Sequence, residues 1–280
     1  MKKVLIAGAK SYIGVSFEAY MHQHVPQYQI DTLDVIGDGW RQADFGGYDV
    51  ILCVAGIAHQ KETEENAKLY YQVNRDLAVD LAVKAKHDGV KHFVFMSSMS
   101  VYGMEQGVIT LDTKPEPKSH YGKSKLEAEQ ALVQLEDSSF RIAILRPPMV
   151  YGKNCRGNFQ LMLKLAKMSP VFPVVNNQRS MISIDNLCAF VCMIIEQEDA
   201  GLFFPQNREY VNTTEMVKLM AEQLNRHIFF SRLAGLAVRA MVPAVGVARK
   251  AFSTLIYQEC EKHAFSYCKE NFAESVKKSV

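Results

Sequence analysis

A tyrosine and a lysine four residues apart, Tyr121 and Lys125, are the side chains in this sequence best placed for acid–base chemistry. On a helix this spacing puts both side chains on one face. A free phenol has a pKa near 10, and a neighbouring ammonium stabilises the phenolate and lowers that pKa. The pair therefore predicts a phenol that exchanges a proton with a bound hydroxyl. The same spacing also occurs in ordinary surface helices.

Two hydroxyl groups precede this pair. Ser97 and Ser98 directly follow residues 93–96, which are all apolar and typical of a buried strand. A hydroxyl at the C-terminal end of a parallel strand faces the crevice in which α/β proteins bind their ligands. We therefore expect a serine here to form a hydrogen bond with a substrate oxygen.

A glycine turn lies near the start of the chain. Residues 8–14, GAKSYIG, join an apolar segment to a helical pattern, and Asp34 follows 20 residues after Gly14. Such a turn exposes helix N–H groups to a pyrophosphate, and a carboxylate at that distance accepts hydrogen bonds from ribose hydroxyls. The alternative is an ordinary strand–helix turn. Asp34 repels a 2′-phosphate, which favours NAD over NADP, although Lys10 or Arg41 could offset this.

The elements that must position these groups are visible as alternating patterns. Short apolar runs alternate with stretches of helical periodicity, which predicts parallel strands with right-handed crossovers and a doubly wound α/β sheet. After residue 202 the pattern is less regular, which suggests a smaller, interleaved lobe. Strands are expected at 4–7, 28–34, 50–54, 92–97, 141–146 and 181–184, and helices at 13–22, 64–87, 121–135, 185–196 and 213–224.

Composition excludes several classes of protein. The chain has 280 residues, 48% of them hydrophobic, and a net charge of +2, so it is neither disordered nor a dedicated nucleic-acid binder. It has no apolar run long enough to span a membrane. Six scattered cysteines without a signal-peptide pattern predict reduced thiols and a cytoplasmic location. Cys188 and Cys192 are expected as small buried side chains rather than as a metal pair.

Nine motifs occur in a recognisable order along residues 2–202. They are GAKSYIG at 8–14, Asp34, ADF at 43–45, VAG at 54–56, Asn74, SSMSVYG at 97–103, YGKSK at 121–125, RPPMVYG at 146–152 and RSMISID at 179–185. In this order they resemble the extended short-chain dehydrogenase/reductases, the nucleotide-sugar epimerase and dehydratase group. The resemblance implies a Rossmann-type NAD(P)-binding domain (1–154 and 174–204) and a substrate-binding lobe (155–173 and 205–280).

The resemblance also implies residue roles. Tyr121 is the general acid/base, Lys125 is its partner and holds the nicotinamide ribose, and Ser98 is the catalytic hydroxyl. Arg179 and Ser98 contact the substrate, Arg179 through a diphosphate, and no metal ligand is expected. His59 and Cys155 lie near the predicted crevice without an assigned role. Asp44 and Phe45 are expected beside the adenine. The implied cofactor-binding residues are Gly8, Lys10, Ser11, Tyr12, Ile13, Gly14, Asp34, Asp44, Phe45, Val54, Ala55, Gly56, Asn74, Tyr121 and Lys125.

The sequence departs from the family pattern in two places. Ser11 stands at the middle glycine of the turn, and Met99 and Ser100 replace the acidic pair of the dehydratases, which disfavours dehydration. The resemblance therefore implies an NAD(P)-dependent enzyme acting at C4 of a diphosphate-linked sugar, with a UDP-sugar 4-epimerase favoured. The alternatives are a 4-keto-sugar reductase of surface polysaccharide synthesis and a non-catalytic NAD-sensing regulator.

Two partner surfaces are predicted. The family resemblance implies a homodimer that pairs residues 64–87 and 121–135 in a four-helix bundle. Residues 232–243 are apolar with flanking cations, a pattern typical of contact with an anionic membrane. Such a contact at the inner face of the membrane would suit a lipid-diphosphate sugar instead of a nucleotide sugar. The alternative is that this segment covers the substrate lobe or a subunit contact.

Overall fold

The computed structural model describes residues 1–58, 60–242, 244–258 and 265–280, and the chain divides into two compact units. Unit 1 comprises residues 1–103, 115–147 and 187–205, and unit 2 comprises residues 104–114, 148–186 and 206–280. These bounds group residues by packing, whereas the domains expected from the sequence were grouped by function. The functional domain boundaries therefore stay a prediction.

Unit 1 is built on a six-stranded parallel sheet, with strand order β2-β1-β3-β4-β6-β10. Val4 of β1 pairs with Ile30 on one side and with Val50 on the other, so the strand order reverses at β1. Such a reversal marks the ligand-binding edge of a doubly wound sheet. The predicted fold class is confirmed, although β10 was not predicted. The strands are β1 (Lys3–Ala7), β2 (Gln29–Leu33), β3 (Val50–Cys53), β4 (His92–Met96), β6 (Arg141–Leu145) and β10 (Gly201–Phe203).

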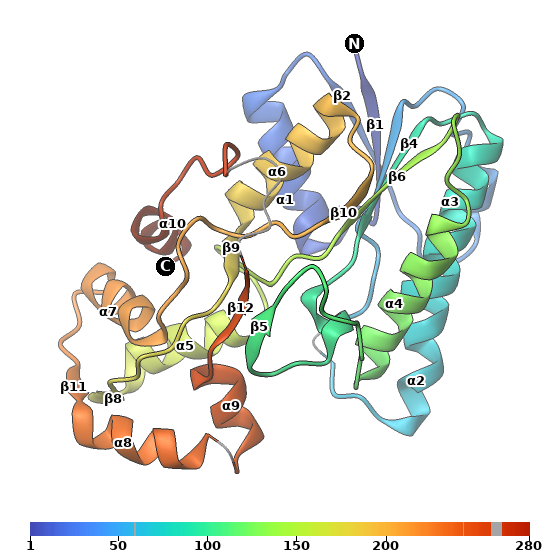
Figure 1. The fold of residues 1–280 in the computed structure, drawn as a ribbon. Helices are drawn as coiled ribbons and strands as arrows, with labels where there is room; N and C mark the ends of the chain where they lie inside the picture. Colours follow the sequence, from blue (N-terminus) through green and yellow to red (C-terminus); the bar gives the residue numbers. More distant parts are fainter. Residues whose placement is uncertain (59, 243, 259–264) are drawn as a thin grey trace. The chain divides into compact units, whose positions relative to one another are not determined.

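Helices cover both faces of this sheet (Figure 1). Leu5 and Phe93 of the sheet pack in one hydrophobic core with Leu81 and Leu132, which come from helices on one face. Because both faces are covered, the central strands are mostly apolar, as the four buried residues of β3 show, whereas the edge strand β2 carries polar residues. The covering helices are α1 (Tyr12–His24) and most of α6 (Ile184–Gln197) on one face, and α3 (Leu77–His87) and α4 (His120–Val133) on the other.

The helix expected at 64–87 is interrupted. It consists of α2 (Glu64–Tyr71), a π-helical segment η2 (Gln72–Asp76) and α3. Asn74 lies in the π segment and is fully buried. Such wide turns are rare and often occur at functional sites. Two short 3₁₀ helices complete unit 1, η1 (Gly39–Gln42) and η3 (Met99–Tyr102).

Unit 2 contains, among its described residues, three two-stranded parallel sheets and five helices. The strand expected at 181–184 is present but pairs with β7 instead of joining the large sheet, and the helix expected at 213–224 is confirmed. The paired strands are β5 (Gly107–Ile109) with β12 (Leu255–Tyr257), β7 (Met149–Tyr151) with β9 (Met181–Ser183), and β8 (Val171–Pro173) with β11 (Phe229–Ser231); the helices are α5 (Asn158–Met168), α7 (Thr213–Gln223), α8 (Arg232–Met241), α9 (Gly246–Phe252) and α10 (Phe272–Ser279).

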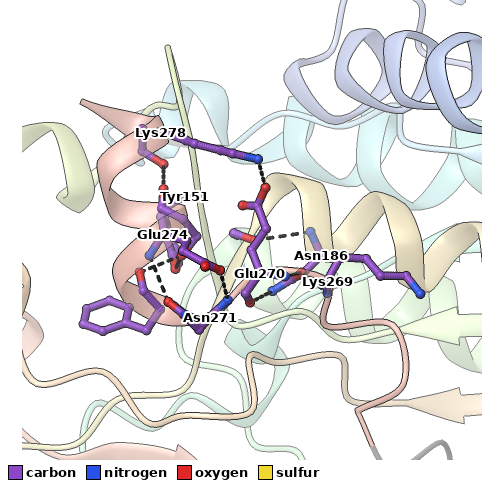
Figure 2. A network of polar contacts seen from close by, with 11 residues as sticks. Tyr151, Asn186, Lys269, Glu270, Asn271, Glu274 and Lys278 are labelled. Carbon is purple, nitrogen blue, oxygen red and sulfur yellow. Dashed lines mark hydrogen bonds and ion pairs between the residues drawn. The ribbon is translucent and has the colours of Figure 1, made fainter.

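Side-chain hydrogen bonds hold the C-terminal helix in unit 2 (Figure 2). Asn271 and Glu274 form a reciprocal capping box at the start of α10. The Asn186 amide oxygen accepts the N–H groups of Lys269 (3.0 Å) and Glu270 (3.4 Å), and its NH₂ donates to the Glu270 carbonyl at 3.2 Å. This part of the tail, which sequence patterns could not order, is therefore fixed by distant polar contacts.

Candidate active site

The glycine turn has the close approaches that a dinucleotide site requires. Gly8 has a φ of +117°, and a Cβ there would lie 2.8 Å from the Ala55 nitrogen. A Cβ at Gly14 would lie 2.8 Å from the Gly8 carbonyl oxygen. Ser11, in place of the middle glycine, caps α1 by accepting the Gly14 N–H at 3.0 Å. The first turn of α1 carries no acidic side chain, so this N-terminus suits a pyrophosphate.

Asp34 follows β2, where the sequence predicted a ribose-binding carboxylate. It accepts the Ile36 N–H at 3.0 Å and the Lys10 ammonium at 2.6 Å. The hydrogen bond from Lys10 is the largest cause that lowers the pKa of Asp34, followed by that from Ile36. Arg41 instead pairs with Asp80 at 2.7 Å. Of the two cations that could offset the Asp34 charge, the one in contact with it is therefore Lys10.

The loop after β3 lies beside the end of β1, where the glycine turn begins. The N–H groups of Val54 and Ala55 both donate to the Ala7 carbonyl oxygen at 3.0 Å. A Cβ at Gly56 would lie 2.9 Å from the Asn74 amide oxygen and 3.3 Å from the Lys125 nitrogen. The structure therefore brings the predicted residues of the loop, the π segment and α4 to one place.

Asn74 connects this loop to the catalytic helix. Its oxygen accepts the Ile57 N–H at 2.8 Å, and its NH₂ donates to the Ser124 hydroxyl at 3.2 Å. The residue is fully buried, and its NH₂ also donates to the Ile57 carbonyl at 3.2 Å. Asn74 is therefore a positioning residue beneath the predicted cofactor surface.

Asp44 and Phe45, which were expected beside the adenine, differ in their surroundings. The Phe45 ring is fully buried in the hydrophobic core, and its N–H donates to Asp88 at 3.2 Å. Its carbonyl accepts the Tyr48 N–H at 3.1 Å, so the ring and backbone of Phe45 are both engaged within the protein, and its contact with the adenine stays a prediction. Asp44 is exposed and accepts the Gly46 N–H at 2.8 Å, so its contact with the adenine stays a prediction.

Ser98 and Tyr121 are brought together where α4 begins. Ser98 caps η3 by accepting the Ser100 N–H at 3.1 Å. Gly122 permits the close packing, because a Cβ there would lie 2.5 Å from the Ser100 carbonyl oxygen. Burial raises the pKa of Tyr121, while a hydrogen bond with Ser98 acts to lower it. The two predicted catalytic hydroxyls are therefore close enough for Ser98 to affect the pKa of Tyr121.

Lys125 has a different environment from the one expected. It is buried, its ammonium donates to the Met96 carbonyl at 2.8 Å, and the same nitrogen lies 4.6 Å from the Phe95 ring centroid. Burial lowers the pKa of Lys125 to about 8. The expected lowering of the Tyr121 pKa is wrong for the protein alone, because burial of the phenol is the largest effect and raises that pKa.

Sequence reasoning missed one carboxylate at the start of the catalytic helix. Glu62 accepts the backbone N–H groups of His120 at 2.8 Å and Tyr121 at 3.1 Å. It thereby satisfies two free donors of the first turn of α4 and places a negative charge at the positive end of the helix. No sequence signal indicates this contact, since Glu62 lies in a loop far from α4 along the chain.

A buried charged network beneath the site was also missed. Glu129 accepts a hydrogen bond from the Ser97 hydroxyl. It also forms a bidentate ion pair with Arg146, whose Nε lies 3.0 Å from Oε1 and whose terminal nitrogen lies 2.5 Å from Oε2. Arg146 also donates to the Tyr102 hydroxyl at 2.8 Å. A signal was available, because Glu129 follows Lys125 by four residues and so lies on the same face of α4.

Arg179, the predicted substrate ligand, lies in unit 2. Its guanidinium donates to the Ser253 carbonyl at 3.0 Å, and burial lowers the pKa of Arg179. No carboxylate of the described residues lies within ion-pair distance of this guanidinium. It lines a pocket together with Lys250, Asn158, Thr213, Ala251 and four methionines, Met149, Met162, Met181 and Met216. A partly buried cation without a counter-ion is suited to an anionic ligand.

The structure supports no catalytic role for the remaining histidine and cysteine candidates. His59 lies outside the described residues. Cys155 is buried, and burial raises the pKa of its thiol, which disfavours a reactive thiolate. Cys188 and Cys192 are buried, as expected. In the described part of the chain, no cluster of three or more metal-ligand side chains occurs, and no helix is both long and apolar enough to cross a bilayer.

These features define a class of protein: an α/β enzyme that binds a dinucleotide at the switch point of a parallel sheet, with the tyrosine predicted to act as acid and base at the start of α4. The chain belongs to the NAD dependent epimerase/dehydratase family, whose model matches residues 4–204. NAD is accordingly its cofactor, and Gly8, Ser11, Gly14 and Asp34 fit it. Because the chain is an enzyme of this family, the non-catalytic regulator is not supported.

Known proteins of this kind are similar over most of the chain. A UDP-glucose 4-epimerase of Vibrio cholerae is 30% identical, over 80% of this chain and 76% of the relative. An N-acetyl-alpha-D-glucosaminyl-diphospho-ditrans,octacis-undecaprenol 4-epimerase of Escherichia coli O157:H7 is 25% identical, over 80% and 73%. The crystal structure of UDP-glucuronic acid 4-epimerase from Bacillus cereus with NAD has the same fold, with a TM-score of 0.75, 17% identity and coverage of 99% and 95%.

Proposed function

We propose that this enzyme is a sugar 4-epimerase that inverts C4 of a UDP-linked hexose. The observation that carries the proposal is the 30% identity to a UDP-glucose 4-epimerase along most of both chains. The effect of Ser98 on the pKa of Tyr121 supports it. Gly8, Ser11, Gly14 and Asp34 would hold NAD, which when bound would supply the hydride chemistry needed at C4.

Each catalytic side chain has a role in this proposal. Tyr121 takes the proton of the 4-hydroxyl as hydride leaves and gives it back as hydride returns. Ser98, which interacts with Tyr121, stabilises the charge that develops on the phenol and the sugar oxygen. Lys125, whose pKa burial lowers to about 8, is assigned to the nicotinamide ribose and, in its charged form, to stabilising the phenolate.

The diphosphate of the substrate is assigned to Arg179. The planar guanidinium presents parallel N–H donors that match phosphate oxygens. The Arg179 guanidinium has no carboxylate partner among the described residues, whereas Lys250, which lines the same pocket, lies 3.8 Å from a Glu105 oxygen. Binding of a diphosphate would supply the counter-charge that this partly buried cation lacks.

The carrier of the sugar has a second candidate, a lipid diphosphate. The 25% identical relative from Escherichia coli acts, by its name, on an undecaprenol-diphosphate sugar. Both carriers have the diphosphate for which Arg179 is suited. A role in surface polysaccharide synthesis, together with a cytoplasmic location and peripheral contact at the inner face of the membrane, belongs to this second candidate.

A homodimer is part of the proposal. The helices expected at the interface carry exposed apolar side chains, with exposed fractions of 42% for Leu69 on α2, 48% for Val83 on α3 and 50% for Val133 on α4. Apolar groups left in water on neighbouring helices favour a helical interface. Sedimentation of the protein and of Leu69→Glu/Val83→Glu tests this, since the double variant should be monomeric.

The decisive experiment measures product and cofactor together. Mass spectrometry of cofactor released from the purified protein should show NAD, and incubation with UDP-glucose should give its 4-epimer without net change in the absorbance of reduced nicotinamide. Net consumption of that absorbance with a 4-keto sugar would identify a reductase instead. Epimerisation of a lipid-diphosphate sugar but not of UDP-glucose would select the second carrier.

A further inference from the structure

One face of α8 is apolar and exposed. Leu233 has an exposed fraction of 80% and Leu236 one of 63%. Ala237 and Ala240 are also exposed, and the four positions follow the i, i+3, i+4, i+7 spacing of a single helix face. Large apolar side chains that share one helix face and remain in water indicate an interaction surface.

The packing of unit 2 fixes this face outward. Gly235 is the buried residue of α8, and a Cβ there would overlap the Val174 carbonyl oxygen. The helix therefore lies against the segment after β8 through its glycine. Because Gly235 lies roughly opposite Leu233 and Ala237 on the helix, the helix cannot rotate to bury its leucines without losing this contact.

The residues that flank α8 in the sequence carry charges of a single sign. Residues 223–258 contain five Arg or Lys and no Asp or Glu, although the whole chain has 32 basic and 30 acidic residues. Arg232 and Arg239 lie seven residues apart, so both lie on one edge of the apolar face. Neither has a carboxylate within ion-pair distance among the described residues. By contrast, Arg249 and Lys250 on α9 lie 3.4 and 3.8 Å from oxygens of Glu105.

We propose that α8 docks the enzyme on a bilayer that contains anionic lipid. Leu233 and Leu236 enter the boundary between headgroups and acyl chains, and Arg232 and Arg239 contact the negatively charged headgroups. The charge complementarity favours this partner over an apolar protein groove. The inference deepens the lipid-linked candidate of the proposed function, because a lipid-diphosphate sugar is held at the same surface, but docking itself does not depend on catalysis.

The test is flotation of the full-length protein with vesicles of phosphatidylcholine alone or with about one-third phosphatidylglycerol. We expect binding to the anionic vesicles only, weakened by high salt because the headgroup contacts are screened. Leu233→Gln/Leu236→Gln should lower the bound fraction about tenfold or more. Arg232→Gln/Arg239→Gln should remove most of the binding to anionic vesicles that high salt weakens.

Leu111→Gln is the matched control, because Leu111 has an exposed fraction of 68% but lies outside this basic segment. It should bind vesicles like the unchanged protein. If anionic vesicles do not bind, or if the Leu233/Leu236 variant binds fully, the docking proposal is overturned. If that variant instead converts a dimer to a monomer in sedimentation, α8 is a contact between copies. Epimerisation of UDP-glucose, measured in parallel, tests the proposed function separately.

Discussion

Arg146 donates two N–H groups to the carboxylate of Glu129, and Glu129 lies one helical turn beyond Lys125. Both side chains are almost fully buried. The pair connects β6 to α4, and the hydrogen bond from Ser97 to Glu129 extends it to the end of β4. A charged network therefore supports the strand end and the helix that carry the predicted catalytic groups.

Removing one partner of this pair should destabilise the protein strongly. Glu129→Leu or Arg146→Met leaves an uncompensated buried charge, which costs about 3–5 kcal/mol of unfolding free energy. The double variant should cost clearly less than the sum of the two. Urea unfolding of all four proteins measures the coupling. Additive losses would show that the pair contributes no mutual stabilisation.

Glu62→Gln should loosen the start of the catalytic helix. The amide carries no charge for the helix N-terminus and accepts hydrogen bonds more weakly, so a loss of about 1 kcal/mol is expected. We also expect kcat to fall more than the affinity for NAD, because Tyr121 loses its positioning. Glu116→Gln, an exposed glutamate, is the control. Equal kinetics for both variants would contradict the assigned role of Glu62.

Tyr121→Phe should abolish proton transfer while leaving the cofactor bound. The variant lacks only the hydroxyl, so turnover should fall by about 10²–10⁴-fold. The cofactor content, measured by mass spectrometry of released NAD, should stay the same. Undiminished epimerisation would remove Tyr121 from the mechanism, whereas loss of bound NAD would give it a binding role instead.

Asp34→Ala should weaken the preference for NAD. The carboxylate would accept hydrogen bonds from the ribose hydroxyls and repel a 2′-phosphate, and each charged hydrogen bond contributes about 1.5–3 kcal/mol. The ratio of NADP to NAD affinity should therefore rise at least about tenfold, measured by titration of the apoprotein. Asp38→Ala, an exposed aspartate nearby, should leave the ratio unchanged. Lys10→Ala should shift the ratio the other way, because it leaves Asp34 unneutralised.

His92 should make the protein less stable in acid. It is buried, and burial lowers the pKa of His92 from 6.5 to about 4. The unfolded chain therefore binds a proton between these values that the folded chain does not, so stability falls as pH falls through this window. The expected loss between pH 7.5 and 5 is about 2 kcal/mol. In urea unfolding, His92→Gln should lose less over this range; an identical loss would contradict the assignment.

The alternation of strands and helices up to β6, the glycine turn and the Tyr121–Lys125 pair could be predicted from the sequence. The reason is that each depends on neighbours close along the chain: continuous apolar runs specify buried parallel strands, and glycine with a following helical pattern specifies the turn. Ser98 could be placed near Tyr121 because parallel strands end at the same edge of the sheet.

The tertiary structure decided which distant groups meet. Glu62 at the start of α4, Arg146 on Glu129 and the π segment around Asn74 depend on packing between segments far apart in sequence. The same packing placed the Phe45 ring in the core. Side-chain environment also decided the pKa directions, because burial is a property of the whole fold. Local pattern thus determined the elements of this protein, while long-range packing determined the charges and contacts around its catalytic groups.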